Sequence, residues 1–158
     1  MPYIVILISL AVAALDYLIK ILVINNLKPI GSVAVIPGLF SLTYVENRGA
    51  AFGMLSDARW IFIIFTILVI CVMFFALFKF KIKSLLFNIS FILIVGGGLG
   101  NLIDRIFYGF VVDYLSVSFF PPVCNFADYC ITVGAFLMVI YLFFHSDKLR
   151  KKKELSDE

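Results

Sequence analysis

Long apolar stretches, separated by short polar segments, make up most of the chain. Four of them approach the roughly 20 mainly apolar residues that a helix needs to cross a membrane: residues 3–24, 60–78, 85–103 and 123–145. The second stretch is unbroken, whereas polar side chains interrupt the other three. This pattern predicts an all-α membrane protein with four transmembrane helices in a single membrane domain over residues 1–158.

The segment between the first two apolar stretches, residues 25–59, is too polar to cross a membrane. Within it, the sequence SVAVIPGLFSLTYV alternates in hydrophobicity around a Pro-Gly pair that is typical of a turn. We therefore expect a small β-sheet there, lying on the membrane surface. Residues 104–122 are expected to form a second loop on the same side, with Pro121 and Pro122 turning the chain into the fourth helix.

Composition supports the membrane class. Of the 158 residues, 63% are hydrophobic and 15% are charged, whereas soluble domains are closer to one half and one quarter. The length leaves no room for a separate soluble module. The first apolar stretch lacks the basic start of a secretion signal, so we expect it to be retained as a helix.

Basic residues predict the orientation, because cytoplasmic loops carry an excess of lysine and arginine. Eight of them fall after the second apolar stretch and in the C-terminal tail: Lys79, Lys81, Lys83, Lys148, Arg150, Lys151, Lys152 and Lys153. We therefore expect both termini in the cytoplasm and residues 25–59 and 104–122 on the outer face. The basic tail, residues 146–158, is expected to be a disordered, solvated end that favours anionic membrane lipid.

Charged residues inside an apolar helix need a partner, because an isolated charge there costs roughly 2.5–3.5 kcal/mol. Asp16 and Lys20 stand four residues apart on one helical face, with the acid first, which is the favourable order for an ion pair. We interpret this pair as a structural clamp rather than as catalytic groups. Asp104 and Arg105 are adjacent and so cannot face each other on a helix; each is expected to find a partner elsewhere in a structural network.

The third apolar stretch ends in GGGLGNLIDRI, in which Gly96, Gly97, Gly98 and Gly100 remove side chains over more than one turn. Such a surface lets another helix, or the backbone or acyl chain of a substrate, approach closely. The spacing does not fit the dinucleotide-binding pattern GxGxxG, because the third glycine would fall on Asn101 or Ile103.

Two aspartates, Asp113 and Asp128, have no basic residue near them in the sequence. The predicted topology brings both to the same membrane face, where two carboxyl groups in a dry site hold one proton between them. Such a pair can activate water with one member and protonate a leaving amine with the other. Alternatively, Asp113 caps a turn and Asp128 caps or orients the fourth helix. The residues alone leave both alternatives open.

Other chemistries are poorly supplied. The one histidine, His145, lies at the opposite end of the fourth stretch, and HExxH, Ser-His-Asp and CxxC arrangements are absent. We therefore expect neither metal-dependent hydrolysis nor hydrolysis by a Ser-His-Asp triad. A phosphate-binding loop is lacking, and nucleic-acid binding has no outer basic patch to support it. Cys124 and Cys130 can in principle pair, but isolated packing thiols are the more common arrangement.

Several motifs together resemble those of bacterial lipoprotein signal peptidase, also called signal peptidase II. They are ENRGAAFG (46–53), VGGGLGNLIDRI (95–106), VVDYL (111–115) and NFADY (125–129). The resemblance covers nearly the whole chain in length, number of helices, orientation and order of motifs. It implies a membrane aspartic endopeptidase without a metal or organic cofactor.

The resemblance also implies roles for individual residues. Asp113 and Asp128 match the two catalytic aspartates, and Asp16 and Lys20 match the D-x-x-x-K pair of the first helix. Positions that line or support the site are matched by Asn47, Gly97, Asn101, Arg105 and Asn125. Two departures concern surrounding hydrogen bonds: Tyr17 replaces a common glutamine, and Tyr129 and Cys130 follow Asp128 where serine is common.

The implied substrate is a prolipoprotein whose lipobox cysteine already carries diacylglyceryl. Cleavage falls on the N-terminal side of that cysteine, at the outer face of the bacterial plasma membrane, and an inhibitor of the globomycin type is expected to bind. Aromatic residues of the outer segment are expected to lie over the site as a platform or lid: Phe40, Tyr44, Phe52 and Trp60.

Two other classes of function compete with this one. A small proton-coupled transporter would use the carboxylates as a relay, but such sites usually lie at the membrane midplane between repeated halves, and no repeat is visible. A non-catalytic assembly protein would use the buried charges only to bind helices together.

Overall fold

The computed structural model describes residues 2–49, 58–80 and 82–154. Within these ranges the chain has four α-helices: α1 (Pro2–Leu22), α2 (Arg59–Lys79), α3 (Leu85–Phe107) and α4 (Phe126–Glu154). A π-helical turn, η1 (Val23–Leu27), continues α1. All four helices contain a segment long and apolar enough to cross a membrane, so the predicted number of membrane-spanning helices is confirmed.

Helix α3 is the centre of the bundle, since it packs against α1, α2 and α4. Three of its glycines make these contacts close. A Cβ atom on Gly96 would lie 2.9 Å from the Ser9 carbonyl oxygen of α1, and one on Gly97 would lie 2.6 Å from the Ala127 carbonyl oxygen of α4. A Cβ atom on Gly100 would collide with the Asp16 carboxylate. The glycine run therefore lets α1 and α4 pack closely against α3.

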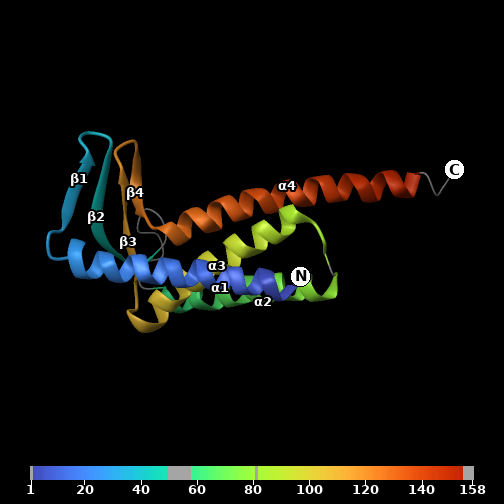
Figure 1. Ribbon diagram of the computed structural model, residues 1–158, viewed down its shortest axis with the longest axis horizontal. Coiled ribbons are helices and arrows are strands. Elements are labelled where there is room, and N and C mark those ends of the chain that lie inside the picture. Colours follow the sequence, from blue (N-terminus) through green and yellow to red (C-terminus); the bar gives the residue numbers. More distant parts are fainter. Residues whose placement is uncertain (1, 50–57, 81, 155–158) are drawn as a thin grey trace.

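An antiparallel sheet of four strands closes one end of the bundle (Figure 1), in the order β1 (Ser32–Ile36), β2 (Phe40–Asn47), β3 (Val111–Val117) and β4 (Phe120–Cys124). The predicted hairpin of the first outer segment is confirmed as β1 and β2. The prediction of a loop at residues 111–122 is wrong, because these residues form most of a second hairpin.

Pro121 and Pro122 do not turn the chain, contrary to the prediction; they lie within β4, and the chain reverses at Ser118 and Phe119. Proline lacks the N–H that a central strand must donate, so it is tolerated at the edge of a sheet. Strand β4 is such an edge strand.

Three predicted boundaries also change. Helix α3 continues to Phe107 instead of ending at residue 103, and α4 begins at Phe126 instead of residue 123, because Val123 and Cys124 belong to β4. The prediction of a disordered tail is wrong as far as Glu154, where α4 ends. Figure 1 shows the start of α1 and the end of α4 on the side of the bundle away from the sheet.

A small apolar core fixes the sheet to the bundle. Val23 and Leu27, at the end of the first helix, pack against Val112 and Tyr114 of β3. Because Asp113 lies between these two buried residues of β3, the packing also holds this aspartate against the helices.

Candidate active site

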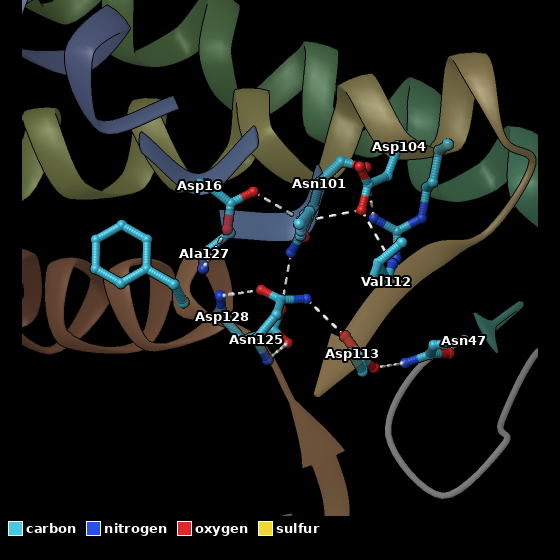
Figure 2. Close-up of polar contacts among 12 residues, drawn as sticks. Asp16, Asn47, Asn101, Asp104, Val112, Asp113, Asn125, Ala127 and Asp128 are labelled. Atoms are coloured by element: carbon cyan, nitrogen blue, oxygen red, sulfur yellow. Dashed lines mark hydrogen bonds and ion pairs between the residues drawn. The ribbon is translucent and has the colours of Figure 1, made fainter. Parts of the chain in front are cut away.

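The two aspartates without basic neighbours in the sequence, Asp113 and Asp128, meet at a single asparagine (Figure 2). Asn125 donates from Nδ2 to Asp113 Oδ1 at 2.6 Å, and its backbone N–H donates to Asp128 Oδ2 at 3.1 Å. The remaining oxygens also accept from amides: Asp113 Oδ2 from Asn47 Nδ2, and Asp128 Oδ1 from Asn101 Nδ2, both at 2.8 Å. All four carboxyl oxygens are thus held by neutral donors.

Asp128 lies in the first turn of α4, where it also caps the helix. Its backbone N–H donates to Asn125 Oδ1 at 2.9 Å while its carboxylate accepts from the Asn125 N–H. This reciprocal pair is a capping box, with Asn125 at the N-cap position and Asp128 three residues later. The suggestion that Asp128 caps the fourth helix is therefore confirmed, and the same side chain faces Asp113.

Other elements hold the start of α4 in place. The N–H of Phe126 donates to the Tyr114 hydroxyl of β3 at 3.2 Å, and the N–H of Ala127 donates to Asp16 Oδ1 of α1 at 3.1 Å. A helix begins with backbone N–H groups that have no partner within the helix. Here side chains from β3 and α1 satisfy them, which fixes the position of Asp128.

Asp113 lies in β3 rather than in a turn, so the suggestion that it caps a turn is wrong. Its side chain is 1% exposed. Burial is the main reason that the pKa of Asp113 is raised, to about 7, and the neighbouring Asp128 carboxylate adds to the effect. The hydrogen bonds from Asn47 and Asn125 oppose it. A group with this pKa can hold a proton near neutral pH.

A second cluster of buried charges lies beside the pair. Lys20 Nζ is 2.8 Å from Asp16 Oδ2 and 2.9 Å from Asp104 Oδ2, and all three side chains are at most 1% exposed. Asp104 Oδ2 also accepts from the Val112 N–H at 3.0 Å. The predicted Asp16–Lys20 pair is therefore confirmed, as is the expectation that Asp104 finds its partner outside its own neighbourhood.

Asn101 connects the two clusters, since Lys20 Nζ donates to Asn101 Oδ1 at 2.8 Å. Arg105, one turn later in α3, lies over the Phe62 ring of α2, with 4.8 Å between the guanidinium carbon and the ring centroid. Its positive charge acts on Asp128 and Asp113 through space. The structure thus brings Asn47, Asn101, Arg105 and Asn125 to one site, together with both aspartates.

Comparison with known proteins identifies the family. Residues 8–144 match the sequence profile described as Signal peptidase (SPase) II. The Lipoprotein signal peptidase of Halothermothrix orenii is 46% identical over 143 residues, which are 90% of this chain and 94% of that protein. The protein of the same name from Clostridioides difficile is 44% identical over 148 residues, covering 92% and 98%.

The chain belongs to the signal peptidase II family. A solved structure of a bacterial membrane enzyme has the same fold, with a TM-score of 0.81 and 33% identity over 91% of this chain and 90% of that one. As a member of this family, the chain is a multi-pass membrane peptidase that processes lipoproteins.

Of the two approaches that the glycine run was expected to allow, the structure shows that of neighbouring helices and not that of a substrate. Gly96, Gly97 and Gly100 do not leave space for a substrate, because α1 and α4 fill their faces. Gly97 supports the site indirectly: it lets α3 approach Ala127, the residue before Asp128, closely enough to place Asn101 beside the pair.

The residues that depart from the family pattern lie around the site. Cys130 is buried against α3, and a Cβ atom added to Gly97 would lie 3.1 Å from the Cβ atom of Cys130. Tyr17 interacts with Tyr108, which directly follows α3, and both line an open groove of about 550 Å³ between α1 and α3. All three cysteines are free, so Cys124 and Cys130 are separate thiols.

Sequence reasoning missed two groups that hold the site together. The Tyr114 hydroxyl accepts a hydrogen bond from the Phe126 N–H, and the Ala127 N–H donates one to Asp16; both fix the start of α4. Neither pair of residues has a spacing in the sequence that would indicate the contact. The capping box could have been found, since Asn125 and Asp128 have the spacing of such a motif. Of the aromatic residues expected over the site, Phe52 lies outside the described residues, as do positions 50–53 of the ENRGAAFG motif.

Proposed function

We propose that this chain is an aspartic endopeptidase whose catalytic groups are Asp113 and Asp128. The observation that carries the proposal is the sharing of Asn125 by the fully buried Asp113 and the partly buried Asp128 carboxyl groups. Among the described residues, no lysine or arginine lies within ion-pair distance of either one. Two carboxyl groups so placed hold one proton between them, as acid–base catalysis by such a pair requires.

The proposed reaction is hydrolysis of one peptide bond. One carboxylate takes a proton from the attacking water as its oxygen bonds to the carbonyl carbon. The other carboxyl group gives its proton to the nitrogen as the C–N bond breaks. The pair begins and ends with one proton, and a transfer between the two carboxyl groups restores the starting state. Asn47, Asn101 and Asn125 orient the carboxyl groups.

The proposed substrate is a prolipoprotein that carries diacylglyceryl on its lipobox cysteine, cleaved on the N-terminal side of that cysteine. The basic residues of the connection between α2 and α3 and of the C-terminal tail favour a cytoplasmic position for that end of the bundle. The sheet and the aspartate pair would then lie at the outer face of the bacterial plasma membrane, where the lipidated cysteine of the substrate resides. An inhibitor of the globomycin type and membrane lipid are proposed partners.

The test uses purified protein in lipid nanodiscs with a diacylglyceryl-modified precursor peptide. We expect cleavage before the lipidated cysteine, undiminished by EDTA. Asp113→Asn and Asp128→Asn are each expected to reduce the activity about a thousandfold or more. Thermal denaturation should show that both variants are still folded. Asp147→Asn is a matched control at the other end of α4, and it should cleave like the parent.

Two results would overturn the assignment. Full activity in either of the two active-site variants would exclude the aspartate pair, and strong inhibition by EDTA would indicate a metal. A transporter or an assembly protein would produce no cleavage at all.

A further inference from the structure

The two catalytic carboxyl groups differ in what stands behind their amide partners. For Asp128 the partner is Asn101, whose oxygen accepts a hydrogen bond from the Lys20 ammonium at 2.8 Å. For Asp113 the partners are Asn47 and Asn125, whose own oxygens accept from the backbone N–H groups of Gly49 and Asp128. Among the described residues, only Asp128 therefore connects to a cation through a single amide.

The Lys20 ammonium also fixes the orientation of the Asn101 amide. An amide oxygen and nitrogen are nearly indistinguishable by shape, but an ammonium can only donate. The Asn101 oxygen must therefore face Lys20, and its NH₂ group must face Asp128. The chain Lys20–Asn101–Asp128 delivers a donor polarised by a positive charge to Asp128 Oδ1, which favours the ionised carboxylate.

The start of α4 acts in the same direction. Asp128 lies in the first turn of this helix and accepts a backbone N–H there, and the positive end of a helix dipole stabilises an anion. Asp113 has no such contact, because it lies in the middle of β3.

The other titratable groups around Asp128 do not reverse this asymmetry. Asp113 and Tyr114 face it from β3, Cys124 from β4 and Arg105 from α3. Burial raises the pKa of Tyr114, to about 12, and that of the Cys124 thiol, so both stay neutral at pH 7. Arg105 attracts both carboxylates. Lys20 also acts on Asp113 through space, but as the smallest of the influences on that group.

We propose that Lys20, acting through Asn101, is a positioning residue that keeps Asp128 the ionised member of the pair, so that Asp113 holds the proton before the reaction. The raised pKa of Asp113, about 7, agrees with this assignment. The inference rests on the proposed function. It gives Asp128 the role of base toward water and Asp113 the role of acid toward the departing nitrogen. After the C–N bond breaks, the proton taken from water passes from Asp128 back to Asp113.

The experiment measures kcat/KM against pH for the parent and its variants in nanodiscs. Activity falls at low pH as the base becomes protonated. Lys20→Met removes the cation, so the midpoint of this acid limb should move up by about one pH unit. Asp104→Asn removes a negative charge from the other side of Lys20 and keeps an oxygen for the Val112 N–H, so the midpoint should move down. Both variants disturb the same buried cluster.

Opposite movements distinguish positioning from a structural role, because loss of packing would lower the activity of both variants without moving the limb. Lys28→Met is a matched control: it removes a cation near the sheet that pairs with Glu46 at 3.1 Å, and its acid limb should stay in place. Where Lys20→Met fails to fold, Asn101→Leu breaks the same chain but keeps the ion cluster, and the upward movement is expected again.

An unmoved acid limb in both Lys20→Met and Asn101→Leu would overturn the inference, as would movement of Lys20→Met and Asp104→Asn in the same direction. Absence of cleavage by the parent protein would instead overturn the proposed function, so the two failures are distinguishable.

Discussion

Two acidic clusters lie side by side in this membrane peptidase, and they are built on opposite principles. In the first cluster, Asp16 and Asp104 share the ammonium of Lys20 at 2.8 and 2.9 Å. In the second, the donors that the described residues offer to Asp113 and Asp128 are all neutral amides. Asp16, Asp104 and Asp113 are fully buried and Asp128 is partly buried, so burial alone does not distinguish a structural carboxylate from one suited to catalysis. The partner does.

The difference has a physical basis. A buried carboxylate beside a cation is held in its charged form, and removing either partner leaves an uncompensated charge. Carboxyl groups that have only amide donors and each other hold a proton instead. The first cluster therefore joins α1 to α3, whereas the second can exchange protons with water and substrate.

The strongest way to break the comparison is to remove the cation. We expect Lys20→Met to reduce the free energy of unfolding by about 3–5 kcal/mol, because two carboxylates lose their partner. Below about pH 4, where Asp113 is protonated, Asp113→Asn should reduce it by only about 1 kcal/mol, because a hydrogen-bonded neutral group takes the place of another. Unfolding in mixed detergent micelles measures both. Equal losses would mean that the two clusters do not differ in the way described.

A pH titration of stability sharpens the contrast for Asp113. Its pKa rises from the ordinary 3.8 to about 7 on folding, so the folded chain binds the proton more tightly than the unfolded chain does. Stability from this group is therefore fully present below about pH 4 and is lost as pH rises to 7, by at most about 4 kcal/mol. Thermal unfolding of the parent minus that of Asp113→Asn isolates the effect. A difference that grows with rising pH would contradict it.

A smaller effect is expected where the glycine run meets the first cluster. Gly100→Ala places a methyl group against the Asp16 carboxylate and should cost about 1–3 kcal/mol by overpacking. Gly98→Ala is the matched control, because its methyl group would lie 3.5 Å from Thr66, an ordinary contact. Thermal unfolding should show a lower midpoint for the first variant only. Similar midpoints for the two would argue against the close approach of α1.

Much of this architecture could be predicted from the sequence because the membrane imposes simple rules. Long apolar stretches predicted the four helices, and the i, i+4 spacing of Asp16 and Lys20 predicted their ion pair. The second hairpin was missed because the second and third residues of β4 are prolines, which usually argue against a strand. Pairing with β3 and an edge position allow them here.

The site was harder to predict than the fold. Sequence brought Asp113 and Asp128 only to the same end of the molecule. Their meeting depends on contacts far apart in the sequence: Asp16 with Ala127, Tyr114 with Phe126, and Lys20 with Asn101. No spacing rule predicts such contacts, and the partner of Asp104 was likewise beyond sequence reasoning.

Asn125 makes three of the contacts described above: it caps α4, donates to Asp113 and donates to Asp128. Replacing its side chain would remove the helix cap and the hydrogen bond to Asp113 together, and would leave only the backbone contact with Asp128. Because one side chain makes both contacts, few substitutions can be accepted at Asn125. For inhibitor design, Asn125 is an anchor that mutation cannot easily remove without disturbing the proposed catalytic pair as well.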